Sequence, residues 1–301
     1  MSTSCAVSLD TLRTKIESLD QLPSIPAILV PLIKMLELPA ESIDVQRIVD
    51  LIAHDKSIAA QTLHMANSPL FGRLQEVKTV RGAVVALGMA RVREIATTCC
   101  MLKLAPPQNG GFDIRYVWEH SLGVALVARR LARKIGYPAP EHAYLGGLLH
   151  DIGIIVNVML FPDEFRAVAR HAQDQRIPMG DAEGHLLGFD HQVSGSFLAE
   201  QWRLSDELNE VIRRHHQCER AQAYHDSVAL VRIADLLCRV RGLGYGYEEC
   251  VQVCFSAEPA WQTLSDKFPI LLRSDLEKFT FELDSYINEV RNLVSVVFRM
   301  Q

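Results

Sequence analysis

The chain has 301 residues, of which 49% are apolar and 22% are charged, with a formal net charge of −5. This composition excludes a mainly disordered chain, and the slightly acidic balance gives no reason to predict nucleic-acid binding. No apolar run reaches the roughly 18 residues that span a bilayer. Met1–Cys5 lacks the basic and apolar parts of a secretory signal, and the seven cysteines form no CxxC pair. We therefore expect a cytoplasmic protein with reduced thiols and no membrane contact.

Hydrophobic spacing predicts helices along nearly the whole chain. In 45–53 the apolar residues recur on one helical face, and Asp44 stands where an N-cap is expected. Pro31 lies inside the apolar run 28–36, so that helix should kink or begin later than the run. The last forty residues repeat the helical spacing, with Ser274 or Asp275 as the candidate cap. Since no period-2 run is long enough for a sheet strand, the predicted fold class is all-α.

Two breaks divide the predicted helices. Pro106–Gly111 combines two prolines with two glycines and is the best linker candidate, and Gly242–Gly246 is a weaker break. We therefore expect an N-terminal helical half (1–106), a central histidine-rich half (112–242) and a C-terminal helical extension (243–301). The extension should pack on the other parts or form a homodimer.

Two smaller features have plain structural interpretations. Cys99 and Cys100 lie in an apolar helix and are expected in the core. The basic residues of 129–134 are expected on a solvated helix face.

The dipeptide His150-Asp151 is the sharpest chemical signal. Adjacent His and Asp side chains at the end of a helix can reach one metal ion if the backbone turns there, and Gly153 is a candidate for that turn. Imidazole suits Fe, Zn, Ni or Mn, and a carboxylate can bridge two ions. A His-Asp pair alone is weak evidence, because His54-Asp55 also occurs and is interpreted as a helix end.

Other ligand-type residues lie on core-facing helical stripes. His120, His215 and Asp235 each share a stripe with aliphatic residues. A lone histidine there is more often a hydrogen-bonded core residue, and Asp235 could instead pair with Arg232 or Arg239. Because several inward polar groups are costly to bury without a partner, the set as a whole favours a metal ion.

A series of ordered motifs resembles a known family. The motifs are Leu22–Pro26, Ile52–Ser57, Leu63–Gly72, Val80–Gly88, Val117–Ser121, Gly146–Gly153, Gly188–His191, Ile212–His216 and Ala234–Leu236. Over roughly residues 15–240 the chain resembles the HDOD family of bacterial signalling proteins. The resemblance implies a multi-helix bundle of HD-superfamily type with an N-terminal helical subdomain.

The resemblance also implies a metal site. The HD-superfamily pattern matches His120, His150, Asp151 and Asp235. In the related HD-GYP phosphodiesterases further histidines hold a second metal, and His191, His215 and His216 stand at matching positions. We therefore expect one or two divalent transition-metal ions, Fe, Mn, Ni or Zn.

Departures from the HD-GYP pattern weigh against catalysis. Ile154 replaces a lysine, Gln217-Cys218 follows the histidine pair, and Gly244–Tyr247 is a poor substitute for the missing GYP element. Arg213 and Arg214 are the only cations expected near a phosphate. The leading hypothesis is therefore an HDOD-type signal-transduction module with a regulatory or structural metal site and a signalling protein partner.

Two alternatives stay open. One is a metal-dependent phosphohydrolase acting on a nucleotide or another phosphate ester. In it Asp151 is the catalytic residue and, with His120, His150 and Asp235, holds the first metal, the other three histidines hold a second, and a bridging water is the nucleophile. The other is a metal-free helical adaptor.

Overall fold

The computed structural model describes residues 7–18, 26–38, 42–71, 76–104, 112–250, 253–273, 287–296 and 298. These residues form α-helices and short 3₁₀ turns with no strand, so the predicted all-α class is confirmed. The first helices are α1 (Leu9–Glu17), α2 (Leu29–Leu36), α3 (Val45–Ala53), α4 (Lys56–Ala66), α5 (Val80–Leu87) and α6 (Met89–Leu102). The central helices are α7 (Arg115–Ile135), α8 (Pro140–Leu149), α9 (Ile152–Leu160), α10 (Pro162–Gln175), α11 (Met179–Leu186), α12 (His191–Gln201), α13 (Asp206–Arg214) and α14 (His225–Val240). The short α15 (Pro259–Lys267) follows, and residues 287–296 are also helical.

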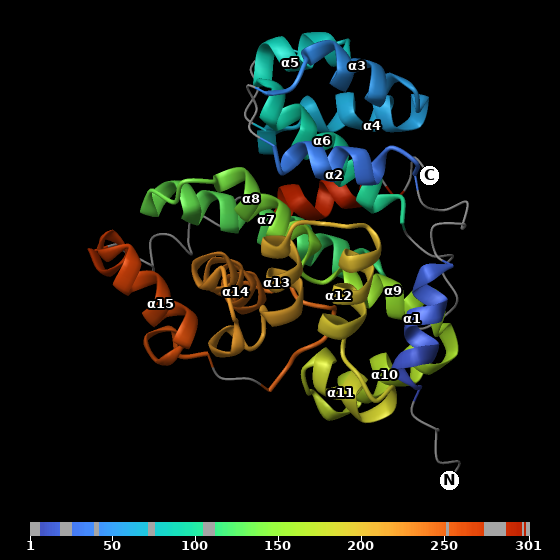
Figure 1. Cartoon of the computed structure of the whole chain (residues 1–301), viewed down its shortest axis with the longest axis vertical. Helices are drawn as coiled ribbons and strands as arrows, with labels where there is room; N and C mark the ends of the chain where they lie inside the picture. The colour runs from blue at the N-terminus through green and yellow to red at the C-terminus, as the bar shows by residue number, and fades with distance from the viewer. Residues whose placement is uncertain are drawn as a thin grey trace.

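The helices form two groups, an upper one of α2–α6 and a lower one built around α7, α8 and α14 (Figure 1). Helix α1 lies against α9 and α12 of the lower group, away from its neighbours in sequence (Figure 1). The C-terminal helical residues 287–296 fit between the groups. Val290 and Val294 are fully buried there, in a core that also contains residues of α2, α6 and α7. The C-terminal segment is therefore part of the core that joins both groups.

Local sequence features explain where the early helices begin. Asp44 caps α3 as predicted, since its side chain accepts a hydrogen bond from the Gln46 N–H. Helix α2 begins at Leu29, one residue later than the apolar run, and Pro31 lies in its first turn, where no intrahelical N–H is needed. The predicted linker 106–111 and the caps Ser274 and Asp275 lie outside the described residues.

The prediction that the basic residues of 129–134 lie on a solvated face of α7 is wrong for Arg129. This side chain is buried and forms an ion pair with Glu94 of α6, whose carboxylate also contacts Arg91. A buried carboxylate needs such partners because desolvation is costly. Arg129 therefore ties α7 to the upper group, whereas Cys99 and Cys100 lie in the core as predicted.

The stretch Pro140–Leu160 is long and apolar enough to cross a membrane. It consists of α8 and α9, which are separated at His150-Asp151, and 83% of the most apolar window is buried in the fold. The apolar character of this stretch is accounted for by its place in the core.

Candidate metal centre

The polar centre of the molecule lies at the join between α8 and α9. His150 ends α8, and Asp151 precedes α9 without making a side-chain capping hydrogen bond, so its carboxylate is free to face the interior. Both side chains are fully buried. Gly153 lies inside α9 and does not supply the expected turn. It permits close packing, because a Cβ there would lie 1.9 Å from the His191 carbonyl oxygen of α12.

Asp151 directs one carboxylate oxygen to each of two histidine pairs. Its Oδ2 lies 3.2 Å from His150 Nε2 and 3.6 Å from His120 Nε2. Its Oδ1 lies 3.4 Å from the Nε2 atoms of both His191 and His215. A carboxylate placed in this way can bridge two ions.

The fold brings all seven predicted ligand residues together. They form two groups whose donor atoms lie within 4.8 Å of one another: Asp151, His191, His215 and His216 in one, and His120, His150 and Asp235 in the other. Six are fully buried, and the His216 side chain alone among the seven is partly exposed, at 22%. These buried His and Asp groups could hold a metal.

Hydrogen bonds fix three imidazoles in the orientation that a metal requires. The Nδ1 atoms lie 2.6–2.9 Å from backbone carbonyl oxygens: His120 with Leu243, His150 with Gly147 and His215 with Ile212. An Nδ1–H donated in this way leaves Nε2 with a free lone pair. Among the described residues, none of these three Nε2 atoms has a hydrogen-bond partner. Buried acceptors without partners are costly, and a cation between them would satisfy them.

His191 is oriented by Glu183, a residue that sequence reasoning missed. The Glu183 carboxylate accepts from the His191 backbone N–H at 2.8 Å and lies 2.6 Å from its Nδ1. Its other oxygen accepts from Asn157 at 2.8 Å. Burial lowers the pKa of His191, but the Glu183 charge outweighs it and raises that pKa to about 9. In the sequence Glu183 is an isolated glutamate that belongs to no motif, so nothing in the residue order indicated its role.

Asp235 lies beside a histidine of the predicted metal site and also pairs with an arginine, the two alternatives that the sequence left open. Its Oδ1 lies 3.2 Å from His120 Nε2, and its Oδ2 accepts from Arg232 Nη1 at 3.2 Å. Burial opposes ionisation, yet the Arg239 charge holds the pKa of Asp235 well below its usual range. The carboxylate is therefore ionised in the site.

His215 faces the opposite effect. Burial lowers its pKa to about 4, which keeps the imidazole neutral. A neutral imidazole is the form that binds a metal.

The segment 242–249, called the strap below, covers one side of the centre. Tyr245 donates its hydroxyl to Asp151 Oδ2 at 2.5 Å, and the Leu243 carbonyl oxygen faces His120. Gly242 and Gly246 have φ of +79° and +86°, a conformation that favours glycine. Sequence reasoning dismissed this stretch as a misplaced GYP element and so missed Tyr245. The sequence feature that could have indicated Tyr245 is its position between two glycines, shortly after the helix that carries Asp235.

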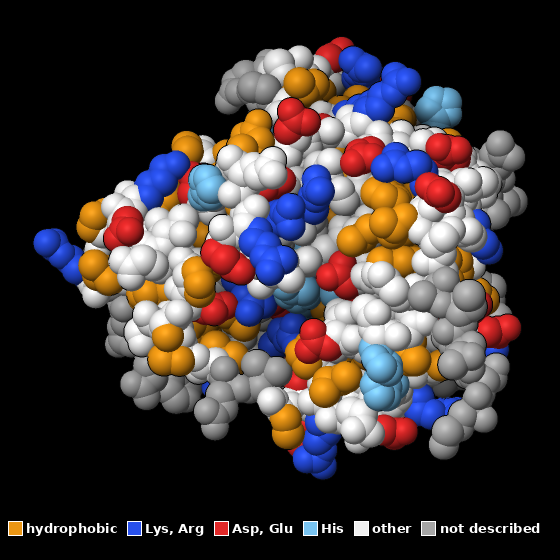
Figure 2. Space-filling model, turned by 60° about the horizontal axis from the view of Figure 1, so that its bottom comes forward, with side chains coloured by type: hydrophobic (Ala, Val, Ile, Leu, Met, Phe, Trp, Pro, Cys, Tyr) orange, Lys and Arg blue, Asp and Glu red, His pale blue; other side chains and the backbone are white. Residues whose placement is uncertain are grey.

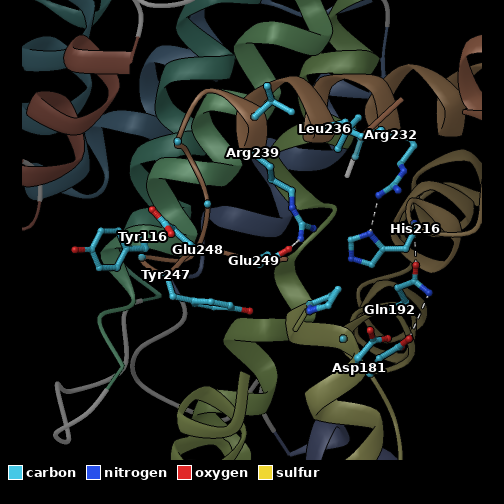
Figure 3. A pocket seen from close by; sticks show the side chains of 18 of the residues that line it. Tyr116, Asp181, Gln192, His216, Arg232, Leu236, Arg239, Tyr247, Glu248 and Glu249 are labelled. Atoms are coloured by element: carbon cyan, nitrogen blue, oxygen red, sulfur yellow. Dashed lines mark hydrogen bonds and ion pairs between the residues drawn. The ribbon is translucent and has the colours of Figure 1, made fainter. Parts of the chain in front are cut away.

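A cavity of about 780 Å³ leads from the surface to His216. Figure 3 shows Arg232 pointing at His216, Arg239 paired with Glu249, and Tyr247 along the opposite wall. Basic and acidic side chains lie next to each other on the face shown in Figure 2. The expectation that Arg213 and Arg214 are the only nearby cations is wrong, because Arg232, Arg239 and Arg291 line this cavity.

Comparison with known proteins agrees with this architecture. The model of the HDOD domain family matches residues 22–218, more than half of the chain. The chain belongs to the HDOD family. A solved HDOD domain protein of unknown function from Geobacter sulfurreducens is 30% identical, with a TM-score of 0.80, over 96% of this chain and 99% of that one.

Other relatives match most of this chain. A Shewanella amazonensis protein provisionally named a phosphohydrolase is 23% identical, with a TM-score of 0.71, over 95% of this chain and 97% of that one. A Marinobacter aquaeolei protein provisionally named a signal transduction protein is 25% identical, with a TM-score of 0.71, over 97% of this chain and 60% of that one. An uncharacterized protein of Treponema pallidum is 22% identical over 240 residues, 77% of this chain. The chain spans 46% of the length of that relative.

Proposed function

We propose that this HDOD protein is a signal-transduction module built around a centre for two divalent transition-metal ions. The observation that carries the proposal is Asp151, whose two oxygens face two separate groups of ligand atoms. The imidazole-rich donor set favours Fe, Mn, Ni or Zn over Mg or Ca. The ions regulate or stabilise the central half, and the upper group α2–α6 offers the surface for a signalling protein partner.

Metal content tests this proposal directly. The protein is purified without chelators and without a histidine tag, and its metals are measured by elemental analysis. We expect two ions per chain in the wild type, and the loss of at least one of them in His150→Ala. The matched control is His54→Ala, the histidine of the other His-Asp pair, which is exposed and should leave the metal content unchanged. No metal in the wild type would leave the helical adaptor as the better description.

A second candidate function, metal-dependent phosphohydrolase, is supported by the cavity beside His216. Arg232 contacts His216 Nδ1 at 3.3 Å, so its guanidinium is at the inner end of the cavity, and Arg239 lines the same wall. Bound ions would supply an activated water and neutralise phosphate charge. The two arginines would bind and orient the ester oxygens, because guanidinium groups recognise phosphate well.

The two arginines of the cavity are already paired with carboxylates. Arg232 donates to Glu258 at 2.7 Å as well as to Asp235, and Arg239 pairs with Glu249. A substrate phosphate must therefore compete with protein carboxylates. This arrangement fits a module that binds a phosphate ester without fast turnover as well as it fits an enzyme.

A substrate screen decides between them. The metal-loaded protein is assayed with phosphomonoesters and with linear and cyclic phosphodiesters. Hydrolysis that is lost in Asp151→Asn and reduced in Arg232→Gln would establish the enzyme, with Arg213→Gln as the matched control outside the cavity. Turnover that persists in Asp151→Asn would rule out this centre as its source.

A further inference from the structure

We propose that the two metal positions are unequal, and that the strap seals one of them while the other exchanges its ion with the cavity. The sealed position is formed by His120, His150 and Asp235, together with Asp151 Oδ2. The open position is formed by His191, His215 and His216, together with Asp151 Oδ1. This inference rests on the proposed metal centre and assigns Tyr245 as a positioning residue in it.

Among the described residues, the hydrogen bonds from the strap to the centre reach His120 and the Asp151 oxygen that belongs to the sealed position. The Tyr245 hydroxyl donates to Asp151 Oδ2, the oxygen that faces His120 and His150. The tyrosine ring packs edge-on against the His120 ring, with centroids 5.1 Å apart, and Leu243 accepts from His120 Nδ1. Tyr245 is itself buried. It therefore closes this position and fixes the carboxylate oxygen within it.

Contacts on both sides hold the strap in place. Arg291 of the C-terminal helical segment donates to the Gly242 carbonyl oxygen at 2.8 Å. At the other end, Tyr247 donates to the Ile177 carbonyl oxygen at 2.9 Å. Gly246 lies so close to Tyr116 that an added Cβ would be 2.5 Å from the ring. Opening of the strap requires these contacts to break together, which makes it a rare event.

The other position reaches solvent through His216. This is the one ligand-type residue of the seven that lines the cavity, and in Figure 3 it lies next to Arg232 and Gln192. The Gln192 side chain accepts from the His216 backbone N–H at 2.9 Å, which positions the residue but leaves its ring facing the cavity. An ion bound by His216 can therefore exchange, and an outside ligand can approach it, without movement of the strap.

His216 also lacks the hydrogen bond that orients the other imidazoles. Its Nδ1 lies 3.3 Å from the Arg232 guanidinium, which can donate but not accept. Its Nε2 lies 3.0 Å from His191 Nε2. Among the described residues, no backbone carbonyl oxygen accepts from this ring, in contrast to the rings of His120, His150 and His215. The open position is therefore less preorganised as well as more accessible.

Metal-release kinetics test the inequality without any assay of activity. Protein loaded with Zn²⁺ alone is mixed with excess chromophoric chelator, and release is followed by absorbance. We expect two phases of similar amplitude, with His216→Gln abolishing the fast one. Tyr245→Phe should accelerate the slow phase about tenfold, the scale seen when a partner that orients a ligand is removed. The matched control is Tyr224→Phe, which removes a hydroxyl from an exposed tyrosine outside the strap and the cavity and should leave the slow phase unchanged.

The outcomes separate this inference from the proposed function. A single phase for both ions, or a slow phase that Tyr245→Phe leaves unchanged, would overturn the sealed position while leaving the two-ion centre intact. Failure to retain zinc in equilibrium dialysis would overturn both. If circular dichroism shows that Tyr245→Phe is unfolded, the release kinetics of the wild type and of His216→Gln still test the inference. Loss of the slow phase in His216→Gln would contradict the assignment of His216 to the open position.

Discussion

The same dipeptide, His-Asp, joins two consecutive helices in each half of this molecule, with different consequences. In the upper group, His54-Asp55 separates α3 from α4. In the lower group, His150-Asp151 separates α8 from α9. His54 is exposed and the Asp55 side chain is 34% exposed, whereas both residues of the second pair are fully buried.

The carboxylate decides the difference. Asp55 accepts from the backbone N–H groups of Ser57 at 2.9 Å and Ile58 at 3.0 Å, and it also binds Lys103. It is therefore used as an N-cap. Asp151 makes no such capping bond, and its oxygens face four histidines instead. In this molecule the carboxylate of a His-Asp pair is thus available to a metal only where the start of the helix does not use it as a cap.

The largest expected effect comes from removing the charge in each pair. Asp151→Asn should lose the bound metal almost completely, because one neutral amide replaces the carboxylate that serves both positions. Asp55→Asn should retain the wild-type metal content. Elemental analysis of the two variants, purified side by side, measures the contrast. Full metal content in Asp151→Asn would contradict the bridging role.

Substitution of Glu183 tests whether the carboxylate that orients His191 contributes to metal affinity. Glu183→Gln should weaken metal binding about 10–100-fold, the usual effect of losing a carboxylate that orients a histidine ligand. The reason is the contact of 2.6 Å between Glu183 and His191 Nδ1. Competition with a chelator of known affinity measures the change. Asp181→Asn on the same helix is the control, since Asp181 is exposed, and an equal loss there would point to a general effect of charge.

The contrast between the two pairs shows how far sequence reasoning reaches. The all-α class follows from helical spacing, whereas the full set of seven ligand-type residues also needs the resemblance to the HD-superfamily pattern. The roles of Glu183 and Tyr245 do not follow. Tyr245 reaches Asp151 from a strap that lies far along the chain and is shaped by two glycines with positive φ. Glu183 is near His191 in sequence, but its contact depends on how the chain turns between α11 and α12. Arg129 was misplaced for the same reason, since its burial depends on α6 and not on its own helix.

Loss of the N-cap that Asp55 provides for α4 should lower the stability of the fold without changing the metal content. Asp55→Ala should lower the free energy of unfolding by about 1 kcal/mol, as for other N-caps. Burial opposes ionisation of Asp55, but hydrogen bonds from Ile58 and Lys103 hold its pKa below the usual value. This contribution is present above about pH 4 and shrinks as the pH falls further, when the carboxylate is protonated. Urea unfolding at pH 7 and pH 3 measures the effect, and an equal loss at both would contradict it.

The smallest expected change in the free energy of unfolding comes from the ion pairs that lie beside the two His-Asp dipeptides. In the upper group, Lys103 of the segment after α6 forms an ion pair with Asp55 at 3.1 Å. In the lower group, His142 of α8 lies 3.2 Å from Glu207 of α13 and ties the helix before His150 to the helix before His215. The hydrogen bond with Glu207 raises the pKa of His142, and His142 lowers that of Glu207.

A histidine with a raised pKa stabilises the fold below its unfolded pKa of about 6.5, and this stabilisation is lost as the pH rises through the folded value. His142→Gln should therefore cost about 0.5 kcal/mol at pH 6, typical of a partly exposed pair, and less at pH 9. Urea unfolding at the two pH values measures this, with Lys103→Gln as the matched variant whose cost should not change between them. If His142→Gln costs more at pH 9, the pair does not brace this join by charge, and packing of the imidazole against α13 is the better explanation.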